Sequence, residues 1–325
     1  MKTMFLFKRK ANQGKKKLLK KNYQSQMSKG FQSNAENMEQ SATESSFQRT
    51  VDDELYGQII PEESPQFVES KLNELQIELD KIQNAEKADW TMAMANCPQL
   101  CDDKFKLMFL RCEGFNIDLA AKRIVKYWAT RVKIFGESKA FLPLVLGEDG
   151  PFKDDNESLK IGFIRFTNKK DSAGRSIMFG DPSRLPIDHS SYENESICRS
   201  LWYCMHVALE DETTQRKGAV FLLFPKHVKF AQFNRKLAKM NAESIKGCIP
   251  IRLSALHVCH PPLVFDLIFP IIKVLMGAHL KKKIRVNSGN EGKVLDELEN
   301  KYGIPREKVP TEMGGGLVLE HEEIS

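Results

Sequence analysis

The chain has 325 residues, 41% of them hydrophobic and 28% charged, which is enough to bury one large core or two smaller ones. Its seven cysteines are an odd number without paired C-x-x-C spacing, so a disulfide framework and a zinc ribbon are disfavoured and a reducing compartment fits best. The strongly apolar stretch 263–276 is shorter than the roughly 20 residues that cross a bilayer. These totals predict a soluble globular chain.

The net charge of +6 is concentrated at the beginning, where ten basic residues precede the first acid, Glu36. Residues 1–55 contain too few apolar side chains to offset the entropy of ordering, so we expect a disordered basic tail. Such a tail attracts anionic lipid headgroups or nucleic acid, or is simply solvated. Nucleic acid is disfavoured because aromatic residues do not interleave with these lysines or with residues 281–283. An organelle transit peptide is a further alternative, whereas the apolar start, residues 4–7, is too short for a secretory signal.

A helical region follows the tail. Ser64 and Pro65 open a helix whose apolar residues recur at spacings of four and three, namely Val68, Leu72, Leu75, Leu79 and Ile82. This stripe over residues 68–82 either packs on the protein's own surface or begins a coiled coil that recruits a protein partner. Residues 102–136 predict two more helices, joined at Gly114.

Beyond residue 160 the hydrophobic period changes, and strands alternate with helices. Two strands are predicted around the turn 171–175, because apolar residues alternate on both sides of it. The later elements are strands at 219–224, 253–258 and 283–287 and helices at 192–210, 230–245, 263–276 and 291–302. This alternation predicts a largely parallel sheet with helical crossovers.

Residues 263–276 need a partner surface. Only Asp266, Pro270 and Lys273 are not hydrophobic in this stretch, so a helix there is apolar on nearly every face and must be covered. Pro270 has no N–H to donate to the carbonyl of Asp266, so we expect the helix to kink or hinge there.

The chain carries no enzyme signature. It has no G-x-S-x-G nucleophile elbow, and its glycine cluster at residues 314–316 does not lie between a strand and a helix as a phosphate loop would. Core or corner packing is a better explanation than zinc binding for the histidines and cysteines of the later half, because they lack the spacing of a ligand quartet: His227, Cys248, His257, Cys259 and His260. We therefore expect no catalytic residue, metal or cofactor.

Several short motifs, in their order and separations, resemble the CRAL-TRIO family of phosphatidylinositol and tocopherol transfer proteins. The matches in chain order are residues 109–117 with F-L-R-A-x-x-F-D-V, 127–131 with the helix that follows, 171–175 with D-x-x-G-R, 249–252 with Y-P-E-R, 260–262 with N-x-P and 309–315 with L-P-x-E-Y-G-G. Together they cover residues 105–316.

This resemblance implies an α/β fold in which a helical N-terminal subdomain precedes a mixed, largely parallel sheet with flanking helices that enclose an apolar pocket for one lipid. Residues 263–276 then correspond to the family's mobile gate helix, which closes over the pocket in solution and opens at a membrane. Burial in the pocket stabilises an acyl chain by about 0.8 kcal/mol per CH₂. The gate residues expected to contact lipid or membrane, with ordinary core packing as the alternative, are Phe265, Ile268, Phe269, Pro270 and Ile272.

The residues that would bind a headgroup depart from the family pattern. Ile251 stands in place of the acid of Y-P-E-R, although Lys283 matches the lysine that accompanies this acid in phosphatidylinositol binders. His227 and Lys229 replace small hydroxyl residues. We expect His227, Lys229 and Lys283 to favour a phosphate or another anionic headgroup, with simple solvation as the alternative for the two lysines. The predicted ligand-binding set also contains Phe221, Leu223 and Arg252.

The sequence thus predicts a disordered tail over residues 1–55, a helical region over 56–140, a CRAL-TRIO lipid-binding domain over 141–318 and a C-terminal tail over 319–325. The expected function is to bind a phospholipid or a hydrophobic small molecule without a chemical reaction and to transfer or present it at an anionic membrane surface. The alternative is a lipid-sensing adaptor that recruits a protein partner through residues 68–82. We expect a cytoplasmic protein that associates peripherally with membranes.

Overall fold

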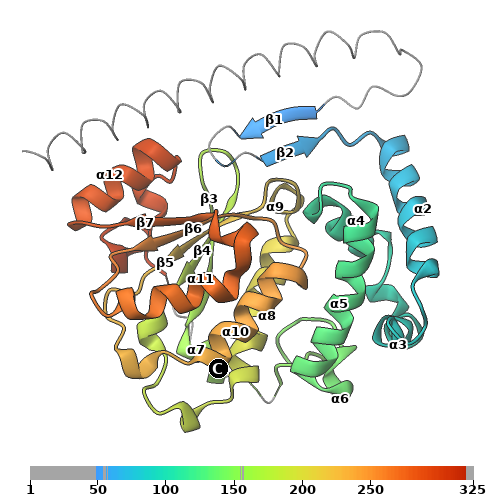
Figure 1. Ribbon diagram of the computed structural model, residues 1–325, viewed down its shortest axis with the longest axis horizontal. Helices are drawn as coiled ribbons and strands as arrows, with labels where there is room; N and C mark the ends of the chain where they lie inside the picture. Colours follow the sequence, from blue (N-terminus) through green and yellow to red (C-terminus); the bar gives the residue numbers. More distant parts are fainter. Residues whose placement is uncertain (1–48, 54–55, 57, 154, 156, 320–325) are drawn as a thin grey trace, which may run out of the picture. The chain divides into compact units, whose positions relative to one another are not determined.

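A computed structural model describes residues 49–53, 56, 58–153, 155 and 157–319 of the chain. Most of the predicted basic tail, up to residue 48, lies outside the described residues, as does the end of the chain from residue 320. Strands β1 (Arg49–Asp53) and β2 (Gln58–Pro61) pair antiparallel ahead of the first helix (Figure 1). The last residues of the expected tail therefore form a strand.

Residues 65–140 form amphipathic helices whose apolar sides pack into one core. Ser64 caps the first helix by accepting a hydrogen bond from the N–H of Phe67, and the helix's apolar stripe buries Leu75 and Leu79 completely. The helical elements are α2 (Pro65–Lys81), α3 (Ala88–Asn96), the 3-10 turn η1 (Pro98–Leu100), α4 (Asp103–Cys112), α5 (Ile117–Phe135) and α6 (Glu137–Ala140). The two leucines lie in the same core as Phe109 of α4 and Trp128 of α5, whereas Val68, Leu72 and Ile82 of the stripe are half-buried.

Arg111, the arginine of the first family motif, joins this helical part to the later half of the chain. Its guanidinium is buried and pairs with the carboxylates of Glu63 and Glu212, each at 2.6 Å, and donates to Gln215 at 2.6 Å. Glu212 and Gln215 belong to helix α9 (Glu212–Lys217). Loss of one member of such a buried pair leaves the other uncompensated, so this motif residue has a structural role.

The sheet has five strands in the spatial order β3-β4-β5-β6-β7. The first pair is antiparallel and the other three pairs are parallel, as a mixed, largely parallel sheet requires. The strands are β3 (Ile164–Lys170), β4 (Ser176–Gly180), β5 (Ala219–Leu223), β6 (Leu253–Cys259) and β7 (Ile284–Asn287). In the turn between β3 and β4, the Asp171 carboxylate accepts from the backbone N–H of Arg175 and pairs with its guanidinium at 2.6 Å, which explains the D-x-x-G-R motif structurally.

Helices cover both faces of the sheet. Val220 and Leu222 of β5 pack with helix α12, whereas Phe221 and Leu223 point to the opposite side, which carries α8, α10 and α11 (Figure 1). The helices of this half are α7 (Glu157–Ile161), α8 (Asn194–Leu209), α9, α10 (Arg235–Gly247), α11 (Phe265–Lys281) and α12 (Glu291–Tyr302). The predicted fold class is therefore confirmed.

Several element boundaries differ from the sequence-based expectation. The apolar helix predicted over 263–276 runs from Phe265 to Lys281. The helix predicted over 230–245 starts only at Arg235, because the side chain of Asn234 accepts from the N–H of Leu237 as an N-cap. The residues before it form a 3-10 turn; the turns of this half are η2 (Pro182–Arg184), η3 (His189–Ser191), η4 (Phe230–Gln232), η5 (Arg306–Lys308) and η6 (Thr311–Met313).

Candidate functional site

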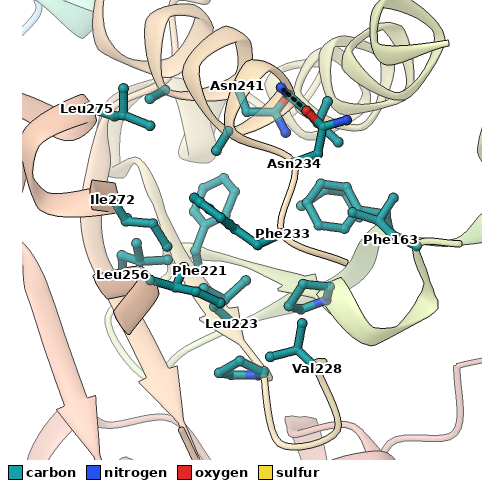
Figure 2. Close-up of a pocket in the computed structure, with 18 of the residues that line it drawn as sticks. Phe163, Phe221, Leu223, Val228, Phe233, Asn234, Asn241, Leu256, Ile272 and Leu275 are labelled. Atoms are coloured by element: carbon teal, nitrogen blue, oxygen red, sulfur yellow. Dashed lines mark hydrogen bonds between the residues drawn. The ribbon is translucent and has the colours of Figure 1, made fainter. Parts of the chain in front are cut away.

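An apolar pocket lies on one face of the sheet, between β5 and β6 on one side and α10 and α11 on the other (Figure 2). We call it the apolar pocket. The strands contribute Phe221, Leu223, Leu253 and Leu256 to its wall. Its volume is about 180 Å³, more than ten times the roughly 10–15 Å³ that one water molecule needs by the same measure, so the pocket takes a much larger molecule.

Among the residues that the structure describes, no charged side chain lines the apolar pocket. Its polar side chains are Gln232, Asn234 and Asn241, and the rest of the wall is made of aliphatic and aromatic residues, proline and alanine. Transfer of an unpaired ion into such surroundings is strongly unfavourable. The pocket therefore suits the uncharged part of a lipid.

Helix α11 forms one wall of the apolar pocket. Phe265, Ile268 and Ile272 line the pocket on the inner side of the helix. The outer side is also apolar, with Leu263 just before the helix 90% exposed, Leu267 66% exposed and Val274 80% exposed. A helix with apolar side chains on both sides can be covered on its outer side by a membrane or a partner.

The break in α11 lies at Gly277 and not at Pro270. Gly277 has φ 73° and ψ 176°, a conformation that is essentially open only to glycine. Pro270 is exposed and keeps helical geometry, although it lies inside the helix and cannot donate to the carbonyl of Asp266. Phe269 does not line the pocket: its ring packs on that of Phe265 at 5.2 Å and lies under the Lys273 ammonium at 3.9 Å.

The three cationic residues expected to form a headgroup site do not come together. His227 and Lys229 are exposed in the loop after β5, and only Val228 between them reaches the apolar pocket. Lys283 immediately precedes β7. Because β5 and β7 run in the same direction, residues after one strand and before the other lie at opposite edges of the sheet.

Lys283 and Arg252 instead share a second cavity, of about 450 Å³, at the edge of the sheet where β6 and β7 begin. We call it the basic chamber. Among the described residues, six lysines and arginines and one carboxylate, that of Glu113, line it: Lys122, Arg123, Lys126, Lys246, Arg252 and Lys283. Ile251, which stands in place of the family's acid, also lies in its wall, and Lys122 pairs with Asp118, outside the wall, at 2.7 Å.

Backbone carbonyls accept hydrogen bonds from several of these cations. The Lys283 ammonium donates to the carbonyl of Leu253 at 2.6 Å, and the Arg123 guanidinium donates to that of Ile249 at 2.9 Å as well as pairing with Glu113. Burial lowers the pKa of Arg252, because its charged form loses solvation there. An anion in the basic chamber would replace part of that solvation.

The apolar pocket and the basic chamber adjoin each other. Ile245 at the end of α10 and Leu253 at the start of β6 belong to the walls of both cavities. A molecule with an apolar body and an anionic end can therefore contact both.

Sequence reasoning missed the residues that other helices contribute to these cavities. Lys122 and Lys126 are one helical turn apart on α5, a spacing that is also typical of an ordinary solvated face. Lys246 at the end of α10 and Asn241 in its middle carry no pattern that distinguishes them from surface residues. Only the tertiary packing, in which α5 contacts α10, shows what these side chains face.

Within the described part of the chain, no group of three or more histidine, cysteine, aspartate or glutamate side chains is placed to hold a metal ion. No helix in that part is long and apolar enough to cross a membrane.

A sheet covered by helices, with an uncharged pocket beneath one of them, is the architecture of an α/β protein that encloses a lipophilic molecule. The model of the CRAL/TRIO domain family matches residues 162–315, within the predicted 141–318. The chain thus contains a CRAL/TRIO domain over residues 162–315.

Curated relatives share this domain. The human alpha-tocopherol transfer protein-like is 30% identical over 221 residues, which is 66% of this chain and 58% of the relative. Clavesin-1 of Xenopus laevis is 24% identical over 222 residues, 66% of this chain and 61% of the relative. Tyrosine-protein phosphatase non-receptor type 9 of Rattus norvegicus is 26% identical over 159 residues, 49% of this chain but only 25% of the phosphatase. The chain spans about three fifths of the length of the first two relatives.

Proposed function

We propose that this protein binds one lipophilic molecule in the apolar pocket and transfers or presents it at an anionic membrane surface. The observation that carries the proposal is an uncharged pocket beneath a helix that is apolar on both sides. The similarity to an alpha-tocopherol transfer protein-like protein supports transfer as the activity.

In this proposal apolar side chains of α11 rest on the pocket in water and on the bilayer interface at a membrane. In water, Phe265, Ile268 and Ile272 rest on the pocket or its ligand, and Leu267 and Val274 remain exposed. At a bilayer the exposed side chains can enter the interface, and each fully buried aliphatic side chain contributes about 1.5–3 kcal/mol. The ligand can then leave past a helix that the membrane stabilises in another position.

The basic chamber provides the attraction to anionic lipid. Its six cations adjoin the apolar pocket, so a phosphate held there lies close to the route by which a ligand enters or leaves. Arginine and lysine pair with phosphate through charge-assisted hydrogen bonds, which are strongest where water is partly excluded. We propose a peripheral membrane protein whose binding to vesicles depends on negative charge.

The proposal is tested with the purified full chain. Lipids that co-purify with it are identified by mass spectrometry, and the transfer of a fluorescent lipid of the identified class between donor and acceptor vesicles is then followed over time. We expect a bound lipophilic molecule and transfer that is faster to vesicles containing phosphatidylserine than to neutral ones. A protein that neither carries a lipid nor accelerates exchange would contradict the proposal.

The adaptor alternative depends on the stripe over residues 68–82. The protein itself uses part of it, because Leu75 and Leu79 are buried in the core with α4 and α5, whereas Val68, Leu72 and Ile82 are half-buried. The similarity to a tyrosine phosphatase covers only a quarter of that enzyme and supplies no reason to propose a reaction.

A further inference from the structure

Two of the three polar side chains in the wall of the apolar pocket are used by the protein itself. The amide N–H groups of Gln232 donate to the carbonyls of Ser183 and Leu185, each at 2.7 Å, and its oxygen accepts from the N–H of Lys229 at 2.8 Å. Asn234 caps α10 through its oxygen and donates to the side chains of Tyr192 and Asn194. These two amides hold the wall together: both N–H groups of each donate within the protein, and each oxygen already accepts one hydrogen bond.

Asn241 differs from both. It lies on the face of α10 that lines the pocket, where its neighbours at helical spacing are Leu237, Ala238 and Ile245. Its side-chain oxygen Oδ1 is buried and has no hydrogen-bond partner among the described residues. Figure 2 shows Asn241 on the α10 wall, on the same side of the pocket as Leu275 of α11 and away from Leu223 of β5. A buried acceptor without a donor destabilises the empty pocket, and a bound O–H or N–H group removes that penalty.

We propose that Asn241 is the specificity-determining residue of the apolar pocket and that it accepts a hydrogen bond from the hydroxyl group of a neutral lipid. This inference rests on the proposed function, since it requires that a lipid occupies the pocket. The lipid's hydroxyl lies at α10, and its hydrocarbon part extends toward Phe221 and Leu223 of β5.

The surroundings of Asn241 exclude charged alternatives. A carboxylate or phosphate offers no donor to Oδ1 and finds no cation in the wall of this pocket, because the cations belong to the basic chamber. An ammonium group could donate but would be buried without a counter-ion. A hydroxyl is uncharged, donates one hydrogen bond and can also accept from the Asn241 amide N–H.

The test compares two probes that differ in one hydrogen-bond donor, dodecan-1-ol and its methyl ether. Binding of each to the delipidated full chain is measured by equilibrium dialysis. We expect the wild-type protein to bind the alcohol about tenfold more tightly than the ether, as one buried hydrogen bond predicts. Asn241→Leu, which makes the wall wholly apolar, is expected to abolish this preference while still binding the ether, and Asn241→Ala provides a second variant if the leucine disturbs packing.

Glu243→Gln is the matched control, because Glu243 is exposed on the same helix and lines neither cavity. It is expected to keep the wild-type preference. Equal binding of alcohol and ether by the wild type, or a preference that survives in both Asn241 variants, overturns this inference and leaves the proposed function standing. Failure of the wild type to bind either probe or any co-purifying lipid overturns the proposed function and this inference with it.

Discussion

The substitution Val274→Asp tests whether the outer side of α11 docks on a membrane. The Val274 side chain is 80% exposed, and full burial of a valine contributes about 1.5 kcal/mol at the lower end of the aliphatic range. The burial still available on membrane contact is therefore about 1.2 kcal/mol, which corresponds to a roughly sevenfold change in partitioning. The aspartate also has to be desolvated, so we expect at least a tenfold loss of binding in flotation with phosphatidylcholine and phosphatidylserine vesicles.

Ile77→Asp is the matched control for this experiment. Ile77 is 58% exposed on α2, in the N-terminal helical part, and belongs to the wall of neither cavity. Its substitution should leave vesicle binding within twofold of the wild type, and both variants should keep the wild-type unfolding temperature. Equal vesicle binding by Val274→Asp and Ile77→Asp would refute the reasoning, because the outer side of α11 would then have no special role.

Three further predictions follow from the structure. Gly277→Ala places a side chain where φ is 73°, so it should destabilise the observed break in α11 by about 1–3 kcal/mol and speed lipid exchange between vesicles; an unchanged unfolding free energy in urea would contradict this. Lys246→Glu in the basic chamber should weaken binding to anionic vesicles at low salt but not to neutral vesicles. The control Lys239→Glu, on the exposed side of α10, should have little effect. Equal losses of vesicle binding in the two variants would argue for general attraction by surface charge. Burial lowers the pKa of His206 to about 3 and that of His257 to about 4, so below about pH 6.5 the unfolded chain binds more protons than the native one. The free energy of unfolding should therefore decrease as the pH is lowered from 6.5 to 4 and increase again when the pH is raised. Urea titrations that gave the same free energy of unfolding at pH 7, 6 and 5 would be incompatible with neutral buried histidines.

Much of the fold could be predicted from local patterns. The alternation of strands and helices after residue 160 predicted the mixed, largely parallel sheet, because period-two and helical hydrophobic spacing each specify an element and parallel strands need helical crossovers. The helix start at Ser64 also followed from capping chemistry that acts over three residues. The start of α10 was predicted too early. The apolar residue Phe230 extended the helical pattern toward the N-terminus, so Asn234 was placed inside the helix although it is the N-cap.

The sequence by itself determined that residues 263–276 form an apolar helix in need of cover, and that the chain has a CRAL-TRIO-like order of motifs. It could not show where the cations gather, since proximity between His227, Lys229 and Lys283 depends on strand direction and not on spacing along the chain. Only the tertiary structure joined Lys283 and Arg252 to Lys122, Lys126 and Lys246 in the basic chamber, and placed Asn241 in an otherwise apolar wall. Periodicity reports which side of an element is apolar, but the surface that a side chain faces is decided by which other elements pack against it.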